Sequence, residues 1–513
     1  MRPSRRLGKA GRRWLLLFHR WAGIAAGLFF ALWIGSGLVM LAVPFPTLTE
    51  AERLALLAPI AWDRVAVAPD EALRAGGLGG VPAVFSLEMR GDEPVYRIAG
   101  RDGTRATVSA RTGARLAPLT PEDALRLAAA GAPAARVVPV ARDQWTVTAR
   151  YDPLRPFLKV ARGDADGTEL YVSQATGEIA LDTTRAERGW NWVGAVAHWI
   201  YLTPLRARPE LWRTILLWLS RFAALGALSG LAIGIWRLRL RRRYAGGAVT
   251  PYRGLARWHH LLGLAGGIGL STFILSGWIS MNPNRWFSSH ASSADIGAAY
   301  AGQPDALGLA AGALRGFAEP GTRALRFAAI GGSWWVIADG PAGNPARRAD
   351  DGSVLEAATI ARAAAPALSG GGLRATAHLT AYDLYWYPHG TDPRPLPVLR
   401  LRFADPASTW LHVDPRDGTI LQRLDRSGRI NRWLFDGAHR LDLPGLTGNR
   451  ALHDAAQWIL NLLAAGIAVT GIAAGWRRLR RTRSADLPTR QHREPGHRDP
   501  DQRRRRSGLL RAP

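Results

Sequence analysis

The sequence predicts an α-helical membrane protein with four transmembrane helices, built from two parallel repeats that carry two external α+β domains. Three observations support this prediction. Four apolar runs are each long enough to cross a bilayer. Each arginine cluster abuts one of these runs, and the second half of the chain repeats motifs of the first at a spacing of about 240 residues.

The apolar runs define the four helices, because each reaches the roughly 20 residues that a helix needs to span the hydrocarbon core. They are Trp14 to Val43, Thr214 to Trp236, Leu261 to Met281 and Ala455 to Trp476. The first run follows a basic segment, as the core of a signal peptide does, but it is much longer than the roughly 7 to 15 residues of such a core. We therefore interpret it as an uncleaved span.

The cations are concentrated beside these runs. The chain has 67 Lys and Arg against 40 Asp and Glu, a net charge of +27, with clusters at Arg2 to Arg13, at Arg237 to Arg243 and from Arg477 to Arg511. Positive residues favour the cytoplasmic side, so we predict a multi-pass protein of the bacterial inner membrane with both termini cytoplasmic. Clusters at helix ends differ from the spread basic face of a nucleic-acid binder, so the expected partner is the lipid bilayer and no nucleic acid.

The predicted segments follow from the helices and their orientation. They are a basic cytoplasmic N-terminus (1–13), helix one (14–43), a first external domain (44–210), helix two (211–236), a cytoplasmic loop (237–257), helix three (258–281), a second external domain (282–453), helix four (454–476) and a disordered basic cytoplasmic tail (477–513). The chain has no cysteine. This excludes disulfides, thiolate-held iron–sulfur clusters and covalently attached c-type haem.

The internal repeat covers helices and external segments alike. The segment from Phe18 to Gly23 matches the segment from Trp258 to Gly263, and His198 aligns with His439. In the external segments, short β-rich runs end in Thr-Gly or Asp-Gly turns, and Ala- and Leu-rich helical patterns occur at Pro121 to Ala130 and Ala357 to Ala365. These patterns are typical of small α+β modules, of which we expect two in each half.

Four histidines recur in the register of the repeat. His19 and His259 lie near the predicted cytoplasmic ends of helices one and three, whereas His198 and His439 lie near the outer ends of the segments that lead into helices two and four. Parallel repeats place equivalent residues at equal depth on opposite sides of a two-fold axis along the membrane normal. Two imidazoles can then bind the two faces of one haem iron. We therefore predict two b-type haems with filled axial positions and a role in electron transfer.

The simpler interpretation is that each histidine just lies in the headgroup region, and preservation of both pairs in one register favours ligation over it.

Three further residues belong to the candidate haem sites. His260 is an alternative to its neighbour, because consecutive helical residues point about 100° apart and only one of them can readily face a given haem. His453 is an alternative ligand at the outer site. Arg221 lies in the middle of helix two, where a charge needs a partner such as a haem propionate or a carboxylate.

The electrons must come from elsewhere. The glycine-rich stretches Gly76 to Gly80 and Gly266 to Gly269 lack the strand, GxGxxG and helix context of a dinucleotide-binding fingerprint, and the chain has no Walker motif. No flavin or nicotinamide module is therefore expected. We predict a separate donor, either cytoplasmic or a quinol.

The motifs resemble those of the PepSY-associated transmembrane family of iron-regulated membrane proteins, over nearly the whole chain up to about Arg483. They are the His-Arg-Trp opening at His19 to Trp21, the Trp-His-His start of helix three at Trp258, the segments Arg394 to Arg400 and Trp410 to Asp414, and Ala-His-Arg-Leu-Asp-Leu-Pro-Gly from Ala438 to Gly445.

This resemblance implies an inner-membrane reductase similar to those that reduce ferric siderophores or other ferric chelates in the periplasm, with b-type haems and PepSY-like external domains. It implies inner ligands at His19 and at His259 or His260, and outer ligands at His198 and His439 with His453 in reserve. Aromatic residues between Tyr382 and Tyr387 are candidates for the chelate-binding surface or, equally, for core positions of a strand. The alternative from the same resemblance is a membrane-anchored PepSY binding or regulatory protein that modulates a peptidase and has no redox activity.

Overall fold

The computed structural model describes residues 8–129, 132–287, 293–340, 345–368, 370–389 and 394–485. The basic N-terminus before residue 8 and the predicted tail from residue 486 onward lie outside these ranges.

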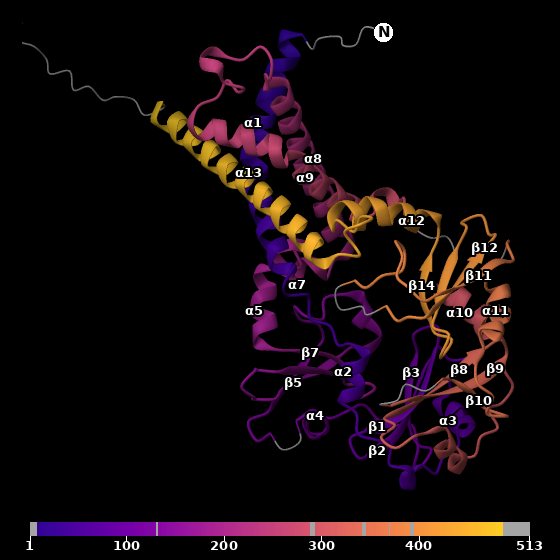
Figure 1. The fold of residues 1–513 in the computed structure, drawn as a ribbon. Helices are drawn as coiled ribbons and strands as arrows, with labels where there is room; N and C mark the ends of the chain where they lie inside the picture. The colour runs from indigo at the N-terminus through magenta and orange to yellow at the C-terminus, as the bar shows by residue number, and fades with distance from the viewer. Residues whose placement is uncertain are drawn as a thin grey trace, which may run out of the picture.

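Four long helices form one end of the molecule (Figure 1). They are α1 (Lys9–Met40), α8 (Pro209–Arg237), α9 (Gly254–Ser280) and α13 (Arg450–Ala485). All four are long and apolar enough to span a membrane, which gives the chain the character of a membrane protein. Each helix begins before the predicted apolar run; α8 and α13 also end beyond it, whereas α1 and α9 end at Met40 and Ser280, before Val43 and Met281. Hydropathy marks only the apolar centre, whereas Lys and Arg are good helix formers and can continue a helix past it.

The long helices pack in a ring, in which α8 and α13 each contact both α1 and α9. Helices α1 and α9 therefore lie diagonally opposite each other. Apolar side chains fill the centre of the bundle, among them Phe30, Ile34, Leu270 and Phe273. Small residues allow close approach, since a Cβ atom at Gly266 would lie 2.7 Å from Leu463 of α13.

The strands form three antiparallel sheets, all at the end of the molecule away from Lys9 (Figure 1). A six-stranded sheet has the order β10-β9-β8-β1-β2-β3, with β1 (Val84–Arg90), β2 (Glu93–Ala99), β3 (Arg105–Ser109), β8 (Ala324–Ile330), β9 (Ser333–Asp339) and β10 (Arg347–Arg348). The first four-stranded sheet contains β4 (Arg136–Val140), β5 (Phe157–Ala161), β6 (Glu169–Ser173) and β7 (Ile179–Thr183). The second contains β11 (Leu373–Leu379), β12 (Val398–Phe403), β13 (Trp410–Val413) and β14 (Ile420–Leu424).

The six-stranded sheet joins the two halves of the chain. Strand β1 pairs with β8, and Ser86 lies opposite Arg326, the residue 240 positions later in the sequence. Beside this pair, the rings of Phe85 and Phe327 lie 4.6 Å apart. The two external segments were predicted as separate domains, but they share this sheet. The pairing satisfies backbone groups that would otherwise form two open edges.

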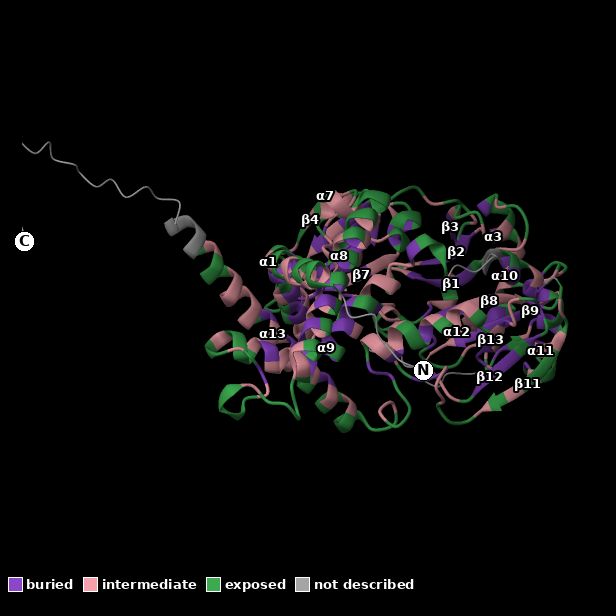
Figure 2. Cartoon of the chain, turned by 90° about the horizontal axis from the view of Figure 1, so that it is seen from above, coloured by how far each residue is buried: buried purple, intermediate pink, exposed green. Residues whose placement is uncertain are grey.

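Shorter helices precede, separate and follow the strands along the chain. They are α2 (Glu50–Ala55), α3 (Pro69–Gly76), α4 (Pro121–Ala128), α5 (Arg185–Val193), α6 (Ala195–Trp199), α7 (Thr203–Arg206), α10 (Ser293–Ala301), α11 (Ala357–Ala364) and α12 (Arg426–Arg432), followed by one helical turn, η7 (Trp433–Gly437). Helices α4 and α11 lie where the helical patterns predicted them. Helices α2, α4 and α5 each begin with a threonine capping box. Buried residues gather in the sheets and between the long helices (Figure 2).

Candidate functional site

The first histidine pair lies across the helix bundle. His19 of α1 and His259 of α9 face each other with ring centres 6.4 Å apart and ring planes inclined by 30°. His19 is ten residues from the start of α1, deeper than the single turn that the predicted helix boundary suggested. Its Nδ1 atom lies 3.2 Å from the carbonyl oxygen of Gly226 and 3.2 Å from the Ser229 hydroxyl. The Nδ1 atom of His259 lies 3.0 Å from the Thr470 hydroxyl.

The second pair lies toward the sheets. His198 of α6 and His439, which follows η7, have ring centres 6.2 Å apart with planes inclined by 71°. The Nδ1 atom of His198 lies 3.1 Å from the Ser36 hydroxyl and 3.1 Å from the Trp33 carbonyl oxygen. The contacts of His439 to the Ser276 hydroxyl (3.1 Å) and the Phe273 carbonyl oxygen (3.0 Å) repeat this arrangement in the second half.

These contacts fix the protonation of the rings. A carbonyl oxygen only accepts hydrogen bonds, so the Nδ1 atoms of His19, His198 and His439 carry the proton and donate it. The Thr470 hydroxyl already donates to the Gly466 carbonyl oxygen, so it accepts from His259. The Nε2 atom of each ring is then left with its lone pair. A metal-binding histidine has this form, with the second nitrogen donating to a carbonyl or hydroxyl oxygen.

The spacing of the rings fits two imidazoles on one metal ion. A bond from histidine nitrogen to a metal is about 2.0 to 2.1 Å long, and the nitrogen lies about 1.1 Å from the centre of a five-membered ring whose bonds are about 1.35 Å. Imidazoles on opposite sides of one ion therefore have centres about 6.3 Å apart. The observed separations of 6.4 and 6.2 Å bracket this value.

A glycine lies against each of the four rings. A Cβ atom at Gly230 would lie 2.6 Å from Cε1 of His19, and one at Gly471 would lie 3.1 Å from Cε1 of His259. Gly37 and Gly277 lie against His198 and His439, each at an ordinary contact distance of 3.6 Å. A side chain at residue 230 or 471 would therefore crowd the first pair, whereas the second pair does not require glycine at the equivalent close contacts.

Each pair offers two imidazole ligands. In the part of the chain that the structure describes, no group of three or more His, Cys, Asp or Glu side chains could hold a metal ion. A metal held between two imidazoles would need its other ligands from outside the protein, and a porphyrin ring supplies them in haem. The two pairs lie at different depths of the bundle, because Ser36, which contacts His198, follows His19 by 17 residues along α1, a rise of about 25 Å.

The three further candidates make contacts other than those of the two facing histidine pairs. His260 points to α8, where its Nε2 atom is 3.0 Å from the Gly234 carbonyl oxygen. The Nε2 atom of His453 is 2.8 Å from the Arg440 carbonyl oxygen, and Asp442 lies 3.4 Å away. Arg221 lies on the exposed face of α8 with its guanidinium 5.4 Å from the centre of the Trp218 ring.

The surroundings of the outer pair differ between the halves. In the first half, Trp212 donates a hydrogen bond to the Trp199 carbonyl oxygen. In the second half, the equivalent residue His453 contacts the equivalent carbonyl oxygen, that of Arg440. Near His453, Asp442 accepts a hydrogen bond from the Tyr387 hydroxyl at 3.0 Å. The second half therefore has an ionisable cluster where the first half has aromatic side chains.

Arg432 lies beside this cluster and is only 5% exposed. One of its Nη atoms donates to the Asp442 carbonyl oxygen, but its Nε and other Nη atoms have no hydrogen-bond partner among the described residues. Buried donors of this kind are usually satisfied. An anionic group that approaches Arg432 would satisfy them.

The aromatic residues from Tyr382 to Tyr387 are divided between core and surface. Trp386 is 1% exposed and stacks on His412, whereas Tyr382 is 49% exposed. The sequence pattern did not separate these two roles, because it does not show which face of the segment meets the sheet.

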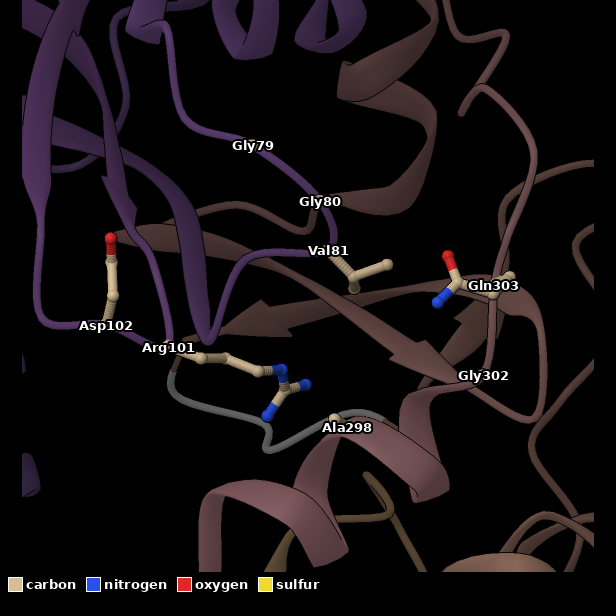
Figure 3. A pocket seen from close by; sticks show the side chains of 8 residues that line it. All are labelled: Gly79, Gly80, Val81, Arg101, Asp102, Ala298, Gly302 and Gln303. Carbon is tan, nitrogen blue, oxygen red and sulfur yellow. The ribbon is translucent and has the colours of Figure 1, made fainter.

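The glycine-rich stretch at Gly79 and Gly80 lines a pocket of about 310 Å³ between the two halves, with Arg101 and the end of α10 (Figure 3). The Arg101 guanidinium points toward Ala298 (Figure 3). No histidine lines this pocket, so it is separate from both histidine pairs.

Sequence reasoning missed the hydrogen-bond acceptors and glycines around the rings. Their signal was present, since Ser36-Gly37 and Ser276-Gly277 recur in the register of the repeat. No protein-family model and no curated protein matches this sequence.

Proposed function

We propose that the chain is a membrane haem protein that carries electrons across the bilayer. The observation that supports it best is the pair of histidine sites at the two ends of one helix bundle, each with ring centres at the spacing of an axial bis-imidazole site. Bound between these rings, haem would supply a one-electron carrier. His19 and His259 would hold the inner haem, and His198 and His439 the outer one.

The surrounding residues orient the ligands. Hydroxyl and carbonyl acceptors on α1, α8, α9 and α13 hold each Nδ1–H and leave each Nε2 lone pair available for a metal ion. Arg432, with its unsatisfied buried donors, is the residue that we propose pairs with a propionate of the outer haem. Arg221, the other candidate for that role, lies on the exposed face of α8.

The proposed orientation follows from the charges. The two halves are parallel repeats, and both place their sheets at one end of the bundle (Figure 1), whereas the start of α1 and the ends of α8 and α13, which carry arginines, lie at the other. The positive-inside rule then puts both termini in the cytoplasm and the sheets in the periplasm of a bacterial inner membrane. The PepSY-like modules would lie outside, beside the outer histidine pair.

The proposed acceptor is a ferric siderophore or another ferric chelate, and the donor is a separate cytoplasmic protein or a quinol. The acceptor is supported by the motif resemblance and by chemistry, because siderophores hold Fe(III) far more tightly than Fe(II). One electron delivered outside would release the metal. The ionisable cluster at Asp442 and His453 makes the second half the better candidate for the place where the electron passes to the ferric chelate.

The experiment that tests the proposal is a reduced-minus-oxidised absorption spectrum of the detergent-purified protein, with the haem quantified as its pyridine complex. We expect a low-spin b-type spectrum and two haems per chain. The double variant His19→Ala/His259→Ala should keep its membrane insertion and lose one haem, and His198→Ala/His439→Ala should lose the other. The matched control His260→Ala/His453→Ala should keep both.

A stably folded protein without haem would overturn this function. It would favour instead a membrane-anchored PepSY binding protein, in which the histidines have a structural role. Loss of haem in the control variant, with retention in His19→Ala/His259→Ala, would overturn the ligand assignment alone.

A further inference from the structure

A basic groove lies between the start of α1 and the end of α8, at the end of the bundle away from the sheets. Its volume is about 470 Å³. The lining consists of five cations, Lys9, Arg12, Arg13, Arg20 and Arg237, and three apolar side chains, Leu16, Leu17 and Trp236.

The described part of the chain does not neutralise these cations. None of the five forms an ion pair in the described part of the chain, and residues 1–49 and 211–294 contain no Asp or Glu at all. The Nε atom of Arg237 is buried and lacks a hydrogen-bond partner among the described residues. Like charges held together in this way repel each other unless an anion lies between them.

The geometry of the groove suits one kind of anion. The guanidinium groups of Arg12 and Arg237 both lie over the Trp236 ring, 5.8 and 4.5 Å from its centre. Leu16 and Leu17 continue the wall along α1 into the apolar part of the helix. A ligand that fits must therefore have an anionic head and an apolar tail.

We propose that this groove binds an anionic phospholipid of the surrounding leaflet. Its phosphate accepts charge-assisted hydrogen bonds from Arg12 and Arg237, and an acyl chain lies along Leu16 and Leu17. This site is independent of the proposed haem function, because it requires only that the helices lie in a bilayer.

The second half of the chain provides a matched control. At the repeat spacing of 240 residues, Lys9 and Arg12 correspond to Val249 and Tyr252, and Arg20 corresponds to His260. Arg253 and Arg477 remain at the positions equivalent to Arg13 and Arg237. Removing these two arginines changes the net charge of the same end of the bundle by the same amount without touching the groove.

The test is native mass spectrometry of the delipidated full chain titrated with phosphatidylglycerol or phosphatidylcholine. We expect the wild type to bind phosphatidylglycerol at least tenfold more tightly. Arg12→Gln/Arg237→Gln should lose about tenfold in affinity, whereas Arg253→Gln/Arg477→Gln should change it less than twofold. Arg12→Lys/Arg237→Lys keeps the charge and should retain most of the preference, which separates charge loss from misfolding.

Two outcomes would overturn the proposal. One is a lack of specificity: equal affinity for the two lipids would show no preference for an anionic head, and an equal loss of affinity in both glutamine variants would show that only diffuse surface charge matters. The other is displacement of phosphatidylglycerol by millimolar inorganic phosphate, which would make the ligand a free phosphate and not a lipid.

Discussion

Gly230 shows how closely the helices pack around the inner histidine pair. It faces His19 from α8, and a Cβ atom built on it would lie 2.6 Å from the ring carbon Cε1. His19 cannot simply turn away, because Gly226 and Ser229 on the same helix hold its Nδ1 atom. The ring position thus depends on the absence of a side chain at residue 230.

We therefore expect Gly230→Ala to displace the His19 ring and to lower the haem content by about one per chain, while the outer site keeps its haem. The control is Gly23→Ala on α1, whose Cβ atom would meet nothing within 4 Å. Haem quantification of both purified variants checks this. Full haem content in Gly230→Ala would mean that the ring contact does not constrain the site.

At the scale of single elements, strands β12 and β13 hold a buried ionisable network. His412 is fully buried, stacks on Trp386 at 4.9 Å, and accepts a hydrogen bond from Nε of Arg400 at 2.7 Å. The same arginine donates to the Asp383 carboxylate at 2.6 and 2.9 Å. Burial, together with the positive charge of Arg400, lowers the pKa of His412 to about 3.

This shift predicts an acid-sensitive fold. An unfolded histidine has a pKa of about 6.5, so between about pH 6.5 and 3 the unfolded chain binds a proton that the folded chain does not. The contribution of His412 to the free energy of unfolding is therefore fully present above about pH 6.5 and falls as the pH is lowered. At about pH 5 the loss is about 2 kcal/mol. We expect His412→Gln to be less stable at neutral pH and to show a smaller further loss at acidic pH.

Chemical unfolding in detergent at the two pH values, followed by tryptophan fluorescence, measures the difference. The control is His378→Gln, an exposed histidine on the neighbouring strand β11, which should follow the wild type. Parallel pH dependence in wild type and His412→Gln would contradict the prediction.

The sequence predicted some elements well and others poorly, for physical reasons. Hydropathy located the four long helices but not their ends, because helix propensity continues through Lys9 and through Arg477. The repeat register indicated which histidines are equivalent, and these are the ones whose rings face each other. It could not orient His260 or Arg221, since the direction of a helical side chain depends on which neighbours its helix packs against.

At the scale of the whole molecule, the two halves are held together twice, once by the bundle and once by the six-stranded sheet. Arg97 of β2 donates to the Thr176 carbonyl oxygen, and Arg326 of β8 pairs with Asp417 at 2.9 Å, so each half ties this sheet to its own four-stranded sheet. The pairing of β1 with β8 was not predictable from local patterns. Strands in different halves of the chain find each other through tertiary packing, and periodicity describes only the faces of a strand.

The arrangement of sheets and arginine clusters at opposite ends makes a prediction about topology that the absence of cysteine allows to be tested cleanly. Ala165 and Ser353 are exposed residues of the sheet region in the first and second half, and Ala248 is exposed in the loop between α8 and α9. A single cysteine at either of the first two positions should react with a membrane-impermeant maleimide in cells whose outer membrane has been permeabilised. Ala248→Cys should react only after the inner membrane is lysed, because the positive-inside rule places this loop in the cytoplasm.

The inverse labelling pattern would reverse the direction of the proposed electron transfer. Labelling of Ala165→Cys without labelling of Ser353→Cys would contradict the parallel repeats.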